Sequence, residues 1–120
     1  MNQEQIAFLQ GQEEQLRQQM LSLGRLAQEN EAAKKALENL SSMKSETLFQ
    51  LGSGVFAKGK ITDDAKVLVE LGGRVIAEKT VEEAKKMLEE RRKQLEKAVA
   101  EIQGNYSQVA QAMEETAKEK

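Results

Sequence analysis

The sequence predicts an α+β fold that is mainly α: a long antiparallel coiled coil of two helices with two β-hairpins between them. Three observations predict it. Apolar residues recur with heptad spacing in both outer thirds of the chain, these two stretches are nearly equal in length, and the middle carries a glycine-containing internal repeat. We expect the 120 residues to form one domain, with a helix over residues 3–43, a double hairpin over 46–79 and a second helix over 81–117.

The first expected helix lacks β-branched residues apart from Ile6. Its seven-residue repeat is led by Leu9, Leu16, Leu23, Asn30 and Leu37. A second series flanks it: Glu13, Met20, Leu26, Ala27, Ala33 and Leu40. Polar residues in such a seam lower stability but fix the register of the two helices. We therefore interpret residues 3–43 as one helix of a coiled coil.

The middle of the chain contains a pattern similar to a phosphate-binding loop. Residues 54–60 read GVFAKGK, which matches G-x-x-x-x-G-K, but Ile61 stands where a Ser or Thr would hold Mg²⁺. The residues that follow show β-branched side chains in loose alternation around an Asp-Asp turn, which is typical of a hairpin and not of a helix. We therefore disfavour an ATPase, which would require nucleotide binding that depends on Lys60.

A repeat with an offset of 20 residues explains the glycines better. Residues 47–58, TLFQLGSGVFAK, align with residues 67–78, VLVELGGRVIAE, and match in type at most positions. Each copy is interpreted as a strand, a tight turn and a second strand. Gly52, Gly54, Gly72 and Gly73 are then turn residues that can take positive φ.

Two simple hairpins are only marginally stable in water and expose unpaired edges. We therefore interpret this segment as an assembly surface that pairs with other subunits in a closed or continuous sheet. The sequence leaves open which of its apolar side chains pack within a hairpin and which face the interface. The residues expected to mediate assembly are Leu48, Phe49, Leu51, Val55, Phe56, Val67, Val69, Leu71, Val75 and Ile76.

The second expected helix begins at a capping box, in which Thr80 is followed three residues later by Glu83. Its heptad series comprises Val81, Leu88, Leu95, Ile102 and Val109, flanked by Val99, Tyr106 and Met113. Arg91 is the one charge expected near the seam. An antiparallel arrangement places Leu40 near Ala84, Leu23 near Ile102, and both chain ends together at a flexible tip.

Composition excludes several classes of function. The chain has no Cys, His, Trp or Pro, which removes thiol chemistry, most metal sites and the usual general base, so we expect no catalytic residue, no metal and no cofactor. A net charge of −2 with interleaved Glu and Lys argues against nucleic acid as a partner. No stretch approaches the roughly 20 apolar residues that cross a bilayer, so we expect no membrane partner and a cytoplasmic location.

The order helix, double hairpin, helix resembles archaeal-type alpha-class prefoldin subunits over nearly the whole chain. The resemblance is carried by ETLFQLGSGVFAKGKI at residues 46–61 and by VLVELGGRVIAEKTVEEAKKMLEERRKQLEK at residues 67–97, and is most specific over 67–88. Two hairpins, where the beta class has one, favour the alpha class. The chain departs from the family at Phe49-Gln50, where Val-Pro is common, and family members often have a longer C-terminal tail.

The resemblance implies an ATP-independent co-chaperone, or holdase, and no enzyme. Two alpha and four beta subunits would join through their hairpins into an intersubunit β-barrel, and the coil tips would pass non-native client proteins to a group II chaperonin. The residues expected to contact clients are Ile6, Phe8, Leu9, Val109, Ala110 and Met113. Leu9, Val109 and Met113 are better explained by packing in the seam, with client contact mainly when the tip opens, so Ile6 and Phe8 are the stronger candidates. The alternative is a structural scaffold or self-assembling prefoldin-like filament without client transfer.

Overall fold

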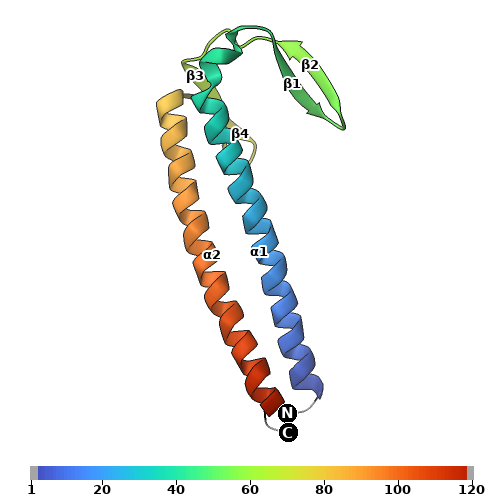
Figure 1. Ribbon diagram of the computed structural model, residues 1–120. Coiled ribbons are helices and arrows are strands. Elements are labelled where there is room, and N and C mark those ends of the chain that lie inside the picture. Colours follow the sequence, from blue (N-terminus) through green and yellow to red (C-terminus); the bar gives the residue numbers. More distant parts are fainter. Residues whose placement is uncertain (1–2, 119–120) are drawn as a thin grey trace. The chain divides into compact units, whose positions relative to one another are not determined.

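The computed structural model describes residues 3–118, without the side chain of Lys118. Along the chain the elements are helix α1 (Gln3–Glu38), the short 3₁₀ helix η1 (Leu40–Lys44), strands β1 (Thr47–Gly52), β2 (Val55–Gly59), β3 (Lys66–Gly72) and β4 (Val75–Thr80), and helix α2 (Val81–Lys118) (Figure 1). The predicted fold class of two long helices with two strand pairs between them is confirmed.

The chain forms two compact units. The coil unit comprises the residues up to Glu29 and those from Arg91, so it contains the outer parts of α1 and α2. The hairpin unit, Asn30–Glu90, contains the rest of both helices, η1 and the four strands. Each unit is described by itself below.

In the coil unit the two helical segments lie side by side in opposite directions. Leu9 and Ala112 line one interhelical cleft, and Leu23 lines the next one together with Ala98 and Ile102. The first turn of α1 and the last turn of α2 therefore lie at the same end, which we call the open end (Figure 1). This arrangement agrees with the antiparallel pairing predicted for Leu23 and Ile102.

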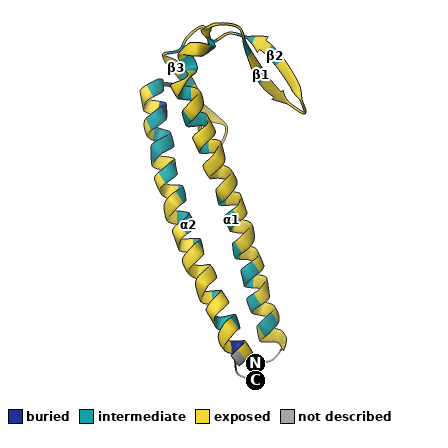
Figure 2. Ribbon diagram, viewed as in Figure 1, coloured by how far each residue is buried: buried dark blue, intermediate teal, exposed yellow. Residues whose placement is uncertain are grey.

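Heptad positions account for most of the half-buried residues of both helices, which face each other while the outer sides are exposed (Figure 2). Three predicted seam positions are exposed: Leu26 at 45%, Tyr106 at 37%, and Ala27. Arg91, the charge expected near the seam of α2, is exposed, whereas Lys85, Glu89 and Arg92 are half-buried. Arg92 pairs with Glu96. An α-helix has 3.6 residues per turn, so a strict heptad drifts relative to the side that faces the partner helix.

The chain has almost no interior of its own. Between residues 3 and 117 only Ala84, at 3% exposure, and Thr116, at 7%, are buried. Most other seam side chains are half-buried, because a two-helix coil covers only one side of each helix. The apolar surface that would stabilise an ordinary domain of this size is left in contact with solvent.

Helix α1 ends at Glu38, five residues before the predicted end at Met43. Asn39 causes the change in geometry, since its side-chain Nδ2 donates to the carbonyl oxygen of Lys35 at 2.9 Å. The Ser42 hydroxyl in turn donates to the Asn39 carbonyl at 2.7 Å. Short polar side chains that bond to the backbone compete with the α-helix, and the chain continues as the 3₁₀ helix η1.

The start of α2 has the predicted capping box. The backbone N–H of Glu83 donates to Thr80 Oγ1 at 3.1 Å, and the backbone N–H of Thr80 donates to Glu83 Oε1, also at 3.1 Å. Thr80 is the last residue of β4, so the strand passes directly into the helix. Both bonds satisfy N–H groups that the first helical turn cannot pair internally.

The linker between the hairpins is bonded to the residues that flank the helices. Within the hairpin unit, the N–H of Ile61 donates to the Met43 carbonyl at 2.8 Å and the N–H of Val81 donates to the Ala65 carbonyl at 3.0 Å. Lys44 Nζ lies 3.2 Å from Asp64 Oδ2. These contacts fix where each hairpin begins and ends.

The two hairpins share one geometry, as the internal repeat predicts. Strand β1 pairs with β2 and β3 with β4, both antiparallel, and each pair has a bulge, at Leu51 and at Leu71. Both central residues of each turn have positive φ: Ser53 and Gly54 in the first, Gly73 and Arg74 in the second. This is the signature of a type I′ turn, whose twist suits a two-residue hairpin.

Residues 54–60 do not form a phosphate-binding loop. Gly54 lies in the turn with φ 78°, and the following residues, Val55–Gly59, form strand β2. A phosphate loop needs a helix N-terminus directly after it, and here the chain continues into the linker. The second glycine of the pattern, Gly59, has a packing role described below.

Candidate assembly and client-binding surfaces

Each hairpin has one half-buried face. In the first, the Phe49 ring lies over Gly59, so that a Cβ on this glycine would meet Phe49 Cε2 at 3.2 Å. Phe49 is paired with Ala57, and in the second hairpin Val69 is paired with Ala77, all four being half-buried. The small partner opposite each large side chain lets the large one fold down onto the sheet.

Most of the apolar side chains of the hairpins are exposed. Of the ten predicted assembly residues, Phe49, Val67 and Val69 are half-buried, and the other seven are exposed by half or more: Leu48, Leu51, Val55, Phe56, Leu71, Val75 and Ile76. The strands appear mostly exposed in Figure 2. Exposed apolar residues at this density are typical of a surface that is covered by another chain.

Leu68 belongs to the same surface, but it is not among the assembly residues expected from the sequence. It is 74% exposed, which is the largest value among the exposed large apolar residues of the structure. The internal repeat contained the signal that identifies it, because Leu68 aligns with Leu48, which was included. Lys58 and Glu78, which pair across the strands with Leu48 and Leu68, give the two exposed faces opposite charges at equivalent positions.

The six predicted client-binding residues all lie in the coil unit, toward its open end. Phe8 is 66% exposed and Ala110 is also exposed. Ile6, Leu9, Val109 and Met113 are half-buried. Leu9 and Val109 line the same interhelical cleft, as expected for seam residues. Phe8 is therefore the large apolar side chain of this set that is most accessible to another molecule.

Two polar contacts lie toward the open end, one between the helices and one within α2. The Tyr106 hydroxyl donates to Glu13 Oε1 at 3.3 Å, which explains why a glutamate occupies a seam position. Thr116 is buried, and its hydroxyl donates to the Ala112 carbonyl at 2.7 Å. Thr116 follows Val109 by seven residues, so extending the heptad by one step would have identified it.

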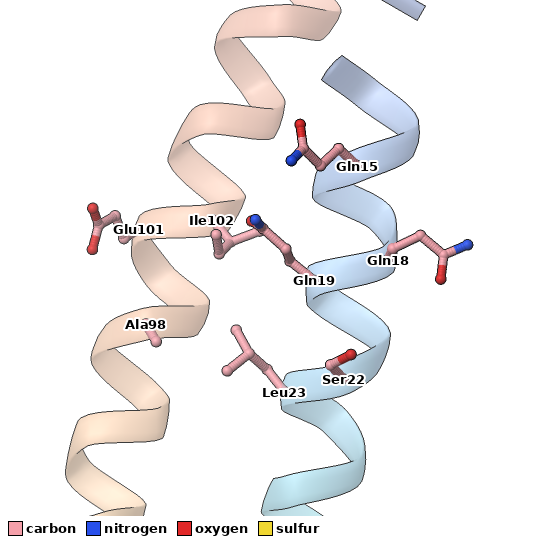
Figure 3. A pocket seen from close by; sticks show the side chains of 8 residues that line it. All are labelled: Gln15, Gln18, Gln19, Ser22, Leu23, Ala98, Glu101 and Ile102. Carbon is pink, nitrogen blue, oxygen red and sulfur yellow. The ribbon is translucent and has the colours of Figure 1, made fainter. Parts of the chain in front are cut away.

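Two neighbouring clefts run between the helices of the coil unit. One, of about 420 Å³, is lined by Leu9, Gln12, Gln15, Leu16, Asn105, Gln108, Val109 and Ala112. The other, of about 590 Å³, is lined by the residues shown in Figure 3: Gln15, Gln18, Gln19, Ser22, Leu23, Ala98, Glu101 and Ile102. The many amide side chains in this lining were not predicted.

Of the residues that line these clefts, Glu101 carries a charge, and Glu14 lies close by on α1. Glu14 accepts hydrogen bonds from Gln18 Nε2 at 3.1 Å and from Arg17 on the outer side of α1. The bond from Gln18, followed by that from Arg17, lowers the pKa of Glu14 below its usual value. Neither Glu14 nor Arg17 lines a cleft, and their two charges pair with each other.

Two further properties bear on function. Among the described residues, no cluster of three or more acidic side chains has the arrangement of a metal site. In the same part of the chain, neither helix is apolar over a length that could span a membrane.

The comparison with known families identifies the relatives of this fold. A family model described as prefoldin subunit matches residues 9–119. The chain belongs to the prefoldin family. None of the curated proteins compared with it matches, so a solved structure is the informative relative of this prefoldin subunit.

That structure is a chain of filamentous PFD from Methanocaldococcus jannaschii, determined by cryo-electron microscopy. It matches 99% of this chain and 100% of its own length with a TM-score of 0.83, at 22% sequence identity. At this identity the likeness shows a common fold. It supports the helix, double hairpin, helix architecture as a fold that the two chains share.

Proposed function

We propose that the chain is an alpha-class prefoldin subunit that acts as a non-enzymatic, ATP-independent holdase. In this proposal the open end of the coil unit captures non-native proteins and delivers them to a group II chaperonin in the cytoplasm. No cofactor takes part, because holding an unfolded chain requires only a surface that binds and releases it. Membership of the prefoldin family supports the chaperone-like class.

The observation that carries the proposal is the exposure of Phe8. The Phe8 side chain is 66% exposed. Keeping an aromatic ring in contact with water is unfavourable, so covering it with an apolar surface of another molecule lowers the free energy. Ile6, Leu9, Val109, Ala110 and Met113 complete the client-binding set. The flexible thioether of Met113 suits contact with clients of varied shape.

The hairpin unit supplies the assembly surface in this proposal. Its two hairpins favour the alpha class, with two alpha subunits joining four beta-class subunits in a hexamer built around an intersubunit β-barrel. The seven exposed residues named above, with Leu68, would be covered in that sheet. Burial of about 25 cal/mol for each Å² of apolar surface makes such assembly favourable.

The test compares two serine substitutions on α1. Phe8→Ser removes the proposed client contact, and Leu21→Ser removes an apolar side chain of almost the same exposure, 65%, further from the open end. Aggregation of chemically unfolded citrate synthase, followed by light scattering, reports protection. We expect Phe8→Ser to raise the protein concentration needed for equal protection about tenfold, the effect of losing about half the burial of one aromatic side chain. Leu21→Ser should leave this concentration unchanged. Equal protection by both variants would contradict the proposal.

A second candidate function is a self-assembling structural filament without client transfer. The observation in its favour is that the matching solved structure comes from filamentous PFD. This function requires the hairpins to pair with copies of the same chain. It predicts large assemblies of the chain alone and no difference between Phe8→Ser and wild type in protecting unfolded citrate synthase.

A further inference from the structure

The two interhelical clefts of the coil unit form one groove. Gln15 lines both of them, so they are adjacent along the same side of the coil. The groove runs along α1 from Leu9 to Leu23, fourteen residues, which corresponds to about 21 Å of helix. An extended polypeptide covers about 3.4 Å per residue, so the groove has the length of about six extended residues.

The lining of the groove combines an apolar floor with an amide rim. Seam residues supply the floor, among them Leu16, Leu23 and Val109. Gln15 and Gln19 point from α1 toward α2, whereas Gln18 and Glu101 point outward from their helices (Figure 3). Each amide side chain offers two N–H donors and one carbonyl acceptor, which are the groups that a peptide main chain needs to bond.

Amide groups and apolar side chains together favour an extended segment of polypeptide. The amides can pair with main-chain N–H and C=O groups whatever the sequence, and the floor can cover apolar side chains. A folded helix satisfies its own main-chain groups and would leave the amide rim without that use. The groove is thus suited to a segment that has lost its secondary structure.

Charge decides which segments fit. Along the groove, residues 9–23 and 98–112 contain three glutamates, Glu13, Glu14 and Glu101, and one basic residue, Arg17, which pairs with Glu14. Glu101 lines the groove itself. A basic segment is attracted to this region, while an acidic segment, including the corresponding part of a second copy of this chain, is repelled.

We propose that the groove holds an extended segment of a non-native polypeptide that carries both apolar and basic side chains. The inference rests on the proposed holdase function and extends it from the open end to the side of the coil unit, with a preference among clients. Main-chain bonds to the amide rim give tolerance of sequence. The carboxylates around the groove give the preference for Lys and Arg.

The first experiment measures this preference with two peptides. A fluorescein-labelled 12-residue peptide of Leu, Ser and Lys is compared with its twin, in which Glu replaces every Lys. Fluorescence anisotropy with the full chain in its native oligomer should show binding of the Lys peptide at least tenfold tighter than that of the Glu peptide. The difference should shrink in 0.5 M salt, because exposed charges are screened. Equal affinities at low salt would overturn the preference.

The second experiment places the binding site. Gln19→Lys introduces a positive charge into the groove, and Gln28→Lys makes the same change on the same helix outside both clefts. We expect Gln19→Lys to weaken binding of the Lys peptide about threefold to tenfold, the range of one or two exposed charge interactions, and to strengthen binding of the Glu peptide. Gln28→Lys should change neither by more than about a factor of two. Equal effects of both variants would overturn the groove as the site.

The outcomes separate this inference from the proposed function. If wild type protects citrate synthase but Gln19→Lys binds both peptides as wild type does, the holdase function stands and the groove is wrong. If wild type neither protects nor binds either peptide, the proposed function fails first. A change in oligomeric mass caused by Gln19→Lys but not by Gln28→Lys would assign the groove to a second copy of the chain and overturn the inference.

Discussion

At the scale of single residues, Thr80 joins the sheet to the helix. It is the last residue of β4, and its hydroxyl accepts a hydrogen bond from the first turn of α2. Thr80→Ala removes this acceptor, and we expect it to lower the free energy of unfolding by about 1 kcal/mol. Urea unfolding followed by circular dichroism measures this change in the free energy of unfolding. Thr80→Ser should restore stability, and Thr62→Ala in the linker is the control. A loss for Thr62→Ala as large as that for Thr80→Ala would show that the cap is not the cause.

Glu83 gives the same junction a dependence on pH. Its pKa is lowered from the usual 4.5, first by the bond from the Thr80 backbone N–H and then by the bond with the Thr80 side chain. A lowered pKa means that the carboxylate stabilises the fold above pH 4.5 and that this contribution is lost as the pH falls through the lowered value. The stability advantage of wild type over Glu83→Ala should therefore shrink between pH 5 and about pH 3. An advantage that stays constant over this range in urea unfolding would contradict the capping role.

Residue types with strong local rules were predictable from the sequence. The capping box and the glycine turns depend on a few neighbouring residues, and both were found where predicted. The roles of Ser53 and Arg74, which share the left-handed turn positions with glycine, were not predicted, because side chains other than glycine rarely adopt that geometry. Leu68 was missed although the repeat pointed to it.

At the scale of elements, the stability of the coil unit depends on which side of α1 a residue occupies. Leu23 is half-buried and lines the cleft with Ile102, whereas Leu21, two residues away, is 65% exposed. We expect Leu23→Ala to lower the free energy of unfolding by about 1 to 2 kcal/mol, less than a fully buried leucine would cost. Leu21→Ala should stay within about 0.5 kcal/mol of wild type. Similar losses for both variants in thermal unfolding would contradict the assigned packing.

The two long helices and their antiparallel pairing were predictable from the sequence, but the residues that line the groove were not. Heptad spacing identifies the middle of the seam, where Leu9, Leu16 and Leu23 lie. The amides at Gln12, Gln15 and Gln19 occupy flanking positions, whose exposure depends on the rotation of each helix about its own axis. A few degrees of rotation decide whether such a side chain lines the space between the helices, and no local sequence rule determines it. The predicted end of α1 was also wrong, because the Asn39 side chain bonds to the backbone and the α-helix ends at Glu38.

At the scale of the whole molecule, the chain lacks the buried surface of an independent domain. Only Ala84 and Thr116 are buried among residues 3–117, while eight large apolar residues of the hairpins are exposed by half or more. The free energy that ordinarily comes from an interior must therefore come from assembly, which makes stability depend on protein concentration. The sequence predicted this incompleteness from its two unpartnered hairpins. It could not predict the composition of the assembly, which depends on the partner chain as well.

The most direct test of this account is the absolute mass of the assembly, measured by multi-angle light scattering after size exclusion. The chain is measured alone and after mixing with a beta-class prefoldin subunit from the same organism. The proposed function predicts a discrete complex of six chains that contains two copies of this chain. Its elution peak should replace the separate peaks of the two subunits. A chain that remains a monomer beside its unbound partner, or that forms open-ended polymers excluding it, would contradict the account; the second result would favour the filament.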